Sequence, residues 1–132
     1  RRGTVVTISS ITGLRSTPLH SYGIGKAAVI RMTENLAGEW GRAGVRVNGV
    51  APGYTLTPLV RRLIEAGERD ASSITNSTAM GRMIEPEEIA NAVAFLAGPE
   101  SSAITGVTIP VDAGWLISPN WQTYGGVRPH DD

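Results

Sequence analysis

The chain of 132 residues contains no cysteine and only two histidines, His20 and His130. Without thiols it cannot form a disulfide framework, and two imidazoles alone do not make a zinc site, so we expect no bound metal. It also lacks runs of like charge, and its 12 basic side chains balance 12 acidic ones. This balance offers no basic surface for nucleic acid or for an anionic membrane, and we expect neither as a partner.

Long apolar stretches are missing as well. The N-terminal sequence RRGTVVTISS contains an apolar run of only about four residues, too short for a signal peptide or a membrane span. We therefore expect a cytoplasmic protein. The composition, with 41% hydrophobic and 18% charged residues, is that of an ordinary globular chain, and the length suits one modest domain.

Three strand-like segments alternate with two helical segments along the chain. Residues 4–8 form a β-branched run without alternation, which predicts a strand covered on both faces; residues 45–53 and 106–112 are the second and third predicted strands. The alternating order favours parallel strands joined by helical crossovers. The expected fold class is therefore α/β with a parallel sheet.

The two helices are predicted from spacing and from end signals. In residues 21–40 an apolar stripe recurs at helical spacing, Ser21 is a suitable cap, and Gly41 closes the helix. Proline and acidic residues at the start of EPEEIANAVAFLAG favour the N-terminus of a second helix, which ends near Gly98. The stripe of the first helix consists of Val29, Met32, Leu36 and Trp40.

Two segments have weaker patterns. Residues 54–83 are polar with little periodicity, which suits either a lid over a site or a plain surface excursion. The tail, residues 115–132, is irregular but rich in aromatic side chains, so we expect it to pack on a neighbouring surface.

The stretch SYGIGKAA, residues 21–28, fits two kinds of site. Its spacing matches the dinucleotide fingerprint G-x-G-x-x-A, but a strand must lead directly into that fingerprint, and here a loop intervenes. A Walker loop needs glycine where His20 stands and Ser or Thr where Ala27 stands. We therefore reject a phosphate loop and interpret the stretch as part of a helix.

In a helix, Tyr22 and Lys26 lie one turn apart and share a face. A phenol has an ordinary pKa of about 10, and a nearby ammonium favours its ionised form. A tyrosine tuned in this way can act as a general acid or base. Ser10 and the Pro52-Gly53 turn each follow a predicted strand, so a parallel sheet would place them at the same edge, where ligands bind.

The order of these motifs resembles the C-terminal half of the short-chain dehydrogenase/reductase family, which has a Rossmann-like doubly wound sheet. The resemblance runs over GTVVTISSITG, SYGIGKAAV, NGVAPGYTLT, EPEEIANAVAFLAG and ITGVTIPVDAG. It implies a domain over residues 1–114, followed by the tail. Two departures are minor: Gly25 precedes the lysine, and Ala113 stands where many relatives have glycine.

The resemblance also implies site roles. Tyr22 would be the proton donor to a substrate carbonyl, Lys26 would bind the nicotinamide ribose and lower the tyrosine pKa, and Ser10 would orient the substrate oxygen. The implied cofactor is NAD or NADP, and residues 58–83 would form the substrate lid. The implied cofactor-binding residues are Tyr22, Lys26, Pro52, Gly53, Thr55 and Thr57.

Two function classes follow from this resemblance. The first is an oxidoreductase that interconverts an alcohol and a carbonyl, with its N-terminal, phosphate-binding half on the same or a separate chain. The second is a catalytically inert fragment or a self-associating assembly module. Residues 21–40 and the last strand resemble the family's oligomer contacts, which implies a dimer or tetramer. The uncharged start of the lid, YTLTPLV, favours a neutral substrate such as a sugar, polyol or ketone, whereas Arg61, Arg62 and Arg69 would favour a carboxylate if they turned inward.

Overall fold

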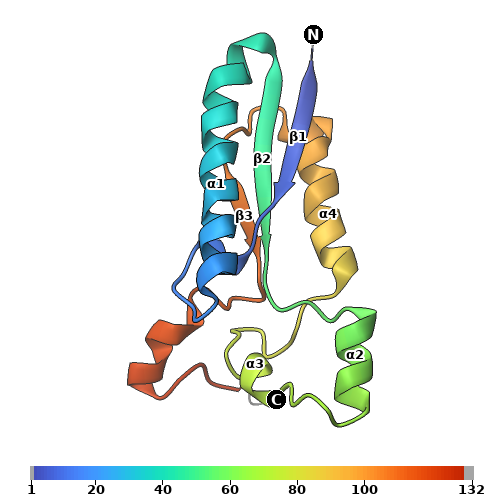
Figure 1. Cartoon of the computed structure of the whole chain (residues 1–132), viewed down its shortest axis with the longest axis vertical. Helices are drawn as coiled ribbons and strands as arrows, with labels where there is room; N and C mark the ends of the chain where they lie inside the picture. The colour runs from blue at the N-terminus through green and yellow to red at the C-terminus, as the bar shows by residue number, and fades with distance from the viewer. Residues whose placement is uncertain (1, 130–132) are drawn as a thin grey trace.

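The computed structural model describes residues 2–129 of the chain, so His130 and the end of the predicted tail lie outside the described residues. Three parallel strands form one sheet in the order β1-β2-β3: β1 (Gly3–Ile8), β2 (Val45–Pro52) and β3 (Thr108–Val111). Helices α1 (His20–Trp40) and α4 (Pro86–Ala97) flank the sheet on opposite sides (Figure 1). The predicted α/β class and the alternating order of strands and helices are confirmed.

Strand β2 is the centre of the core. It pairs with β1 from Gly3↔Val45 to Ile8↔Val50, and with β3 from Gly49↔Thr108 to Pro52↔Val111. The residues from Val47 to Ala51 are buried, as expected for a strand with a neighbour on each side and a helix over each face.

The prediction that the first strand is covered on both faces is wrong. The faces of β1 are partly exposed, since Val5 and Ile8 keep 38% and 45% of their surface exposed. At its edge, β1 has β2 as its one strand partner within the described chain. Its β-branched residues give the sequence of an inner strand. Its other edge is open in this structure.

Helix α1 begins one residue before the predicted cap. The N-cap is Leu19, without a side-chain hydrogen bond, and Ser21 lies inside the helix, so the prediction of a Ser21 cap is wrong. The buried positions are Thr33 and Ala37, whereas Met32 and Trp40 of the predicted stripe are exposed. A threonine can face the sheet here because the Thr33 hydroxyl is 2.6 Å from the Thr7 hydroxyl.

Helix α4 begins with a capping box, as the acidic residues before it suggested. The Glu85 side chain accepts a hydrogen bond from the backbone at Glu88, and the Glu88 side chain accepts one from the Glu85 N–H. At the other end of α4, the Arg46 guanidinium donates to the carbonyls of Leu96 and Gly98, both at 3.0 Å. A cation on the last carbonyls of a helix also suits the helix dipole.

The polar excursion contains two short helices, α2 (Pro58–Glu65) and α3 (Ser72–Thr75), which lie beyond the carboxyl ends of β2 and β3 (Figure 1). A parallel bridge between Thr55 and Ile84 joins the two ends of the excursion. The remaining helical segments are short 3₁₀ turns: η1 (Ile11–Gly13), η2 (Gly41–Ala43), η3 (Pro99–Ser101) and η4 (Ser118–Tyr124).

The tail is more regular than its sequence suggested, because η4 follows the turn after β3. The Ser118 hydroxyl donates to the Gly114 carbonyl at 2.6 Å and ties η4 to that turn. The expected aromatic packing occurs at the start of the tail, where the Trp115 ring meets the Tyr54 ring edge to face, with centroids 6.1 Å apart. Tyr124 at its end is 80% exposed.

Candidate active site

Ser10 lies in the turn that follows β1 at the carboxyl edge of the sheet. It is 7% exposed and is the N-cap of η1. Its hydroxyl oxygen accepts two hydrogen bonds from Thr12, one from the backbone N–H at 3.2 Å and one from the side-chain hydroxyl at 3.0 Å. The serine is therefore held in place by its own turn.

Glycine lets this turn sit directly on α1. A Cβ atom built on Gly13 would be 2.8 Å from the Ala27 nitrogen and 2.8 Å from the Lys26 carbonyl carbon. A Cβ on Gly23 would be 3.0 Å from the Thr12 carbonyl oxygen. Because neither glycine carries a side chain, the turn with Ser10 packs against the first turns of the helix that holds Tyr22 and Lys26.

Tyr22 and Lys26 lie one turn apart in α1, as predicted. The Lys26 ammonium is 5.6 Å from the centroid of the Tyr22 ring and donates a hydrogen bond of 3.3 Å to the Ile8 carbonyl at the end of β1. The Tyr22 side chain is 52% exposed. The structure thus brings Tyr22, Lys26 and the Ser10 turn to the same end of the sheet.

Pro52 and Gly53 lie at the same edge, at the end of β2. The Gly53 N–H donates to the Val111 carbonyl at 2.8 Å, and a Cβ on Gly53 would be 2.8 Å from the Asp112 Cα. The close approach of the chain after β3 explains why this position is glycine.

The two threonines that follow make local hydrogen bonds. The Thr55 hydroxyl donates to the Gly53 carbonyl at 3.1 Å. The Thr57 hydroxyl accepts from the Val60 N–H at 3.3 Å and caps α2. These contacts give both threonines structural roles at the predicted cofactor edge.

Sequence reasoning missed three polar residues that support this edge. Thr12 holds Ser10, as described above. Asn48 is completely buried, and its side chain joins β2 to the loop before β3 through the Ile104 carbonyl and the Val107 N–H. Asp112 caps the turn after β3 by accepting from the N–H groups of Gly114 and Leu116. The asparagine could have been noticed as a polar residue inside a predicted buried strand.

Residues 58–83, the predicted lid, are joined to α4 by a bidentate ion pair. The Glu88 carboxylate accepts hydrogen bonds of 2.8 and 2.7 Å from the Arg82 guanidinium. These bonds, together with the one from the Glu85 N–H, lower the pKa of Glu88 from 4.5 to about 2. Arg61 in α2 forms a second pair with Glu85, at 3.1 Å.

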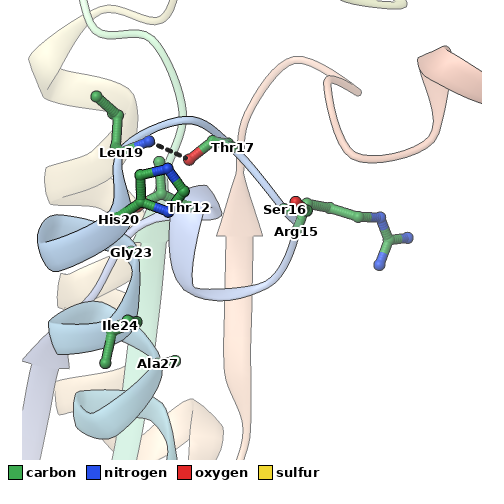
Figure 2. A pocket seen from close by; sticks show the side chains of 9 residues that line it. All are labelled: Thr12, Arg15, Ser16, Thr17, Leu19, His20, Gly23, Ile24 and Ala27. Atoms are coloured by element: carbon green, nitrogen blue, oxygen red, sulfur yellow. Dashed lines mark hydrogen bonds between the residues drawn. The ribbon is translucent and has the colours of Figure 1, made fainter.

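A cavity of about 250 Å³ lies between the loop before α1 and the start of that helix (Figure 2). It is formed by the segment after Ser10 and the first turns of α1, and Arg15 points away from the helix (Figure 2). Thr12 lines it, whereas Ser10, Tyr22 and Lys26 do not.

A second cavity, of about 330 Å³, lies between α2 and α3 of the predicted lid. It is lined by apolar side chains and by Arg61, Glu65 and Arg82.

Among residues 2–129, no three acidic or histidine side chains gather as potential metal ligands, and no helix is long and apolar enough to span a membrane.

Comparisons with known proteins identify the class. The family described as Enoyl-(Acyl carrier protein) reductase matches residues 1–116. The chain is 44% identical over 113 residues to an uncharacterised short-chain type dehydrogenase/reductase of Sinorhizobium fredii, a match that covers 85% of this chain and 21% of the relative. It is 42% identical over 118 residues to galactitol 2-dehydrogenase of Rhizobium johnstonii, a match that covers 87% of this chain and 46% of the relative. The chain spans less than half the length of these relatives.

Solved structures agree on the fold. A structure named ribose-5-phosphate isomerase from Brucella melitensis superposes with a TM-score of 0.90 and 52% identity, covering 97% of this chain and 50% of that one. ElxO with NADP bound superposes with a TM-score of 0.83 and 36% identity, covering 86% of this chain and 46% of that one. The fold is a Rossmann-like α/β sheet. The chain belongs to the short-chain dehydrogenase/reductase family.

Proposed function

We propose that this chain carries the catalytic part of an NAD(P)-dependent oxidoreductase that interconverts an alcohol and a carbonyl. The observation that carries the proposal is the placement of Tyr22 and Lys26 one turn apart, with the Lys26 ammonium bonded to the end of β1 and the Ser10 turn packed on the same helix. The relatives support it, since one is named as a galactitol dehydrogenase and ElxO was solved with NADP.

The donors at this edge suit the nicotinamide end of the cofactor. An ammonium has three N–H donors, and in Lys26 one of them is bonded to the Ile8 carbonyl. The two others can donate to the hydroxyls of a ribose. Pro52, Gly53, Thr55 and Thr57 would line the same edge. When bound, the nicotinamide gives or takes the hydride.

The residues of this chain would handle the proton and the substrate oxygen. In reduction, the Tyr22 phenol donates its proton to the substrate oxygen as that oxygen gains negative charge. The Lys26 ammonium stabilises the phenolate that remains, because a nearby positive charge favours the ionised form. Ser10 donates a hydrogen bond to the same oxygen and orients it, so the three residues have separate tasks.

A neutral substrate, such as a sugar, polyol or ketone, suits the lid. Of the four arginines in residues 58–83, Arg61 is paired with Glu85 and Arg82 with Glu88, whereas Arg62 and Arg69 form no ion pair within residues 2–129. Those two cations are therefore neutralised by partners within the chain. Residues 58–83 would close over the substrate, because the lid helices lie beyond the carboxyl ends of the strands, as Figure 1 shows.

Two further parts of the proposal concern assembly. Residues 1–114 would form the catalytic part of the domain and residues 115–132 the tail. A nucleotide-binding half, on the same or another polypeptide, would pair with the open edge of β1.

A dimer or tetramer would form through the exposed side of α1, where Ile24 is 72% exposed. Self-association without catalysis is the alternative function, and the same exposed residues favour it.

The substitution Tyr22→Phe tests the proposal in the protein that contains the nucleotide-binding half. Removing the phenolic proton should lower kcat by about 10² or more, the effect of losing a general acid. Cofactor affinity should change little, because the ring remains. Turnover is followed through the nicotinamide absorbance with a panel of polyols, sugars and ketones.

Three outcomes separate the candidate activities. Loss of absorbance change in the Tyr22→Phe variant supports the proposal. Wild-type turnover in that variant, with chemistry limiting the rate, contradicts it. If ribose 5-phosphate is added to the panel, its isomerisation with no net change in nicotinamide absorbance would instead point to the activity for which the Brucella structure is named.

A further inference from the structure

The Ser10 side chain accepts two hydrogen bonds, and both come from Thr12. Both the backbone N–H and the side-chain hydroxyl of Thr12 donate to the Ser10 oxygen, at 3.2 and 3.0 Å. A serine hydroxyl can accept two hydrogen bonds and donate one. Thr12 therefore fills both acceptor positions and leaves Ser10 only its own proton to offer to a ligand.

This arrangement matters for a substrate that presents an oxygen. A carbonyl oxygen, and the negative charge that develops on it in reduction, both require hydrogen-bond donors. A free serine could rotate and accept a hydrogen bond instead, for example from the alcohol of the substrate or from water. With both acceptor positions taken by Thr12, the Ser10 hydroxyl acts as a donor in either direction of the reaction.

We propose that Thr12 is a positioning residue that fixes Ser10 as a hydrogen-bond donor to the substrate oxygen. The proposal deepens the oxidoreductase function proposed above and rests on it. Thr12 acts through Ser10 and needs no contact of its own with the cofactor.

Packing around Thr12 supports this role. The carbonyl oxygen of Thr12 faces Gly23, where a Cβ would approach it to 3.0 Å. Gly23 directly follows Tyr22 in α1, so Thr12 lies between the Ser10 hydroxyl and the helix that carries the proton donor. A shift of Thr12 would change the position of Ser10 relative to Tyr22.

The experiment compares Thr12→Val with Thr12→Ser in the enzyme that contains both halves, using a substrate that Tyr22→Phe turns over poorly. Valine keeps the shape of threonine but removes the hydroxyl, whereas serine keeps it. Loss of one hydrogen bond of ordinary strength should lower kcat by about tenfold in Thr12→Val. Thr12→Ser should restore kcat to within about twofold of the wild type, since one donor is regained.

A Ser10→Ala background separates positioning from general loop stability. If Thr12 acts through Ser10, Thr12→Val should cause no further loss of turnover once the serine hydroxyl is gone. Thr17→Val is the matched control, because the Thr17 hydroxyl accepts from the Leu19 N–H in the same loop (Figure 2). It should keep wild-type kcat.

The possible results decide between the two proposals. Two results overturn the positioning role and leave the oxidoreductase function standing. One is wild-type kcat in Thr12→Val; the other is a Thr12→Val loss of kcat in the Ser10→Ala background as large as in the wild type. Equal turnover of the wild type and Tyr22→Phe overturns the oxidoreductase function, and the role of Thr12 with it.

Discussion

Buried polar side chains are satisfied throughout the described chain. Within residues 2–129, no buried side-chain nitrogen or oxygen lacks a hydrogen-bond partner. Asn48 and Ser101 are completely buried yet bonded to backbone groups. Because an unpaired buried polar group costs about 1–3 kcal/mol, these bonds make the polar positions compatible with a small core.

Among residues 2–129, one residue other than glycine has a positive φ angle. Ala113 has φ 52°, in the left-handed region that favours glycine. We expect Ala113→Gly to raise the free energy of unfolding by about 0.5 kcal/mol. The relief of about 1–2 kcal/mol of strain exceeds the roughly 0.5–1 kcal/mol that glycine loses in conformational entropy. Urea unfolding of the two proteins measures this difference.

The neighbouring Gly114 provides the contrast for that experiment. It has φ 81°, and a Cβ there would be 2.5 Å from the Ala79 Cβ. Gly114→Ala should therefore destabilise the protein. A lower unfolding free energy for Ala113→Gly than for the wild type would show that the turn is not strained.

The sequence could predict that Tyr22 and Lys26 lie one turn apart on a helix, but it could not predict hydrogen-bond contacts within folded loops. Tyr22 and Lys26 were identifiable because a helix places them on one face. Thr12 and Asp112 were not, since their roles depend on which backbone groups the folded loops bring within reach. In the sequence, Ala113 is a minor departure from the family pattern. Only its φ angle of 52° shows that the backbone is strained there.

At the scale of elements, the contact between η1 and α1 depends on Gly13. We expect Gly13→Ala to lower the free energy of unfolding by about 1–3 kcal/mol, the usual cost of overpacking, because its Cβ would meet backbone atoms that cannot move aside. Turnover should fall as well, since the turn carries Ser10. Thermal unfolding and kcat measure the two effects.

Gly25→Ala, in α1, is the control for Gly13→Ala in η1. Apart from its chain neighbours and the backbone of α1 itself, no atom lies within 4 Å of a Cβ built there, so alanine should stabilise α1 by up to about 1 kcal/mol. If the two alanine variants were equally stable, the close seating of η1 on α1 would not contribute to the fold.

The Arg82–Glu88 ion pair at the start of α4 should contribute less to the free energy of unfolding in acid. The pKa of Glu88 is lowered to about 2, chiefly by the hydrogen bonds from Arg82. A carboxylate with a lowered folded pKa stabilises the protein fully above its unfolded value, here 4.5, and loses that contribution as the pH falls through about 2. The stability difference between wild type and Glu88→Gln should therefore be constant above about pH 5 and should shrink towards pH 2.

Denaturant unfolding at several pH values measures this difference. Glu87→Gln is the control, because Glu87 is exposed on the same turn and its side chain forms no hydrogen bond or ion pair with residues 2–129. The free energy of unfolding of Glu87→Gln should depend on pH in the same way as that of the wild type. A Glu88→Gln difference that does not change with pH would contradict the role of the ion pair.

The existence and order of the elements were predictable, whereas the faces they bury were not. The apolar stripe predicted α1, but the helix turns Thr33 and Ala37 to the sheet and leaves Met32 outside. Hydrophobic spacing indicates a helix without saying which partner covers each side. The same limit applies to β1, whose sequence suits an inner strand although one edge is open.

At the scale of the whole molecule, residues 1–132 by themselves should bind NAD(H) or NADP(H) negligibly. Much of the affinity for a dinucleotide comes from a pyrophosphate held at a helix N-terminus directly after a strand. The G-x-G-x-x-A match lies inside α1, so it cannot form such a loop. The open edge of β1 should also cause self-association.

Isothermal titration with each dinucleotide and light scattering test these expectations. A monodisperse monomer with micromolar affinity would contradict both, and would reopen the phosphate-loop interpretation of residues 21–28. Restored binding after addition of a nucleotide-binding half would support the proposed pairing at β1.

The bridge between Thr55 and Ile84 has a consequence for the evolution of such chains. The Leu56 N–H donates to the Ile84 carbonyl at 2.8 Å, and the Ile84 N–H donates to the Tyr54 carbonyl at 2.9 Å. The two ends of the lid are thus fastened together before the chain continues into α4. Lengthening a loop whose ends are joined costs little closure entropy. The segment between Thr55 and Ile84 can therefore be replaced or lengthened with little effect on the rest of the fold. If residues 58–83 form the substrate lid as proposed, substrate preference can change through this segment while Ser10, Tyr22 and Lys26 stay in place.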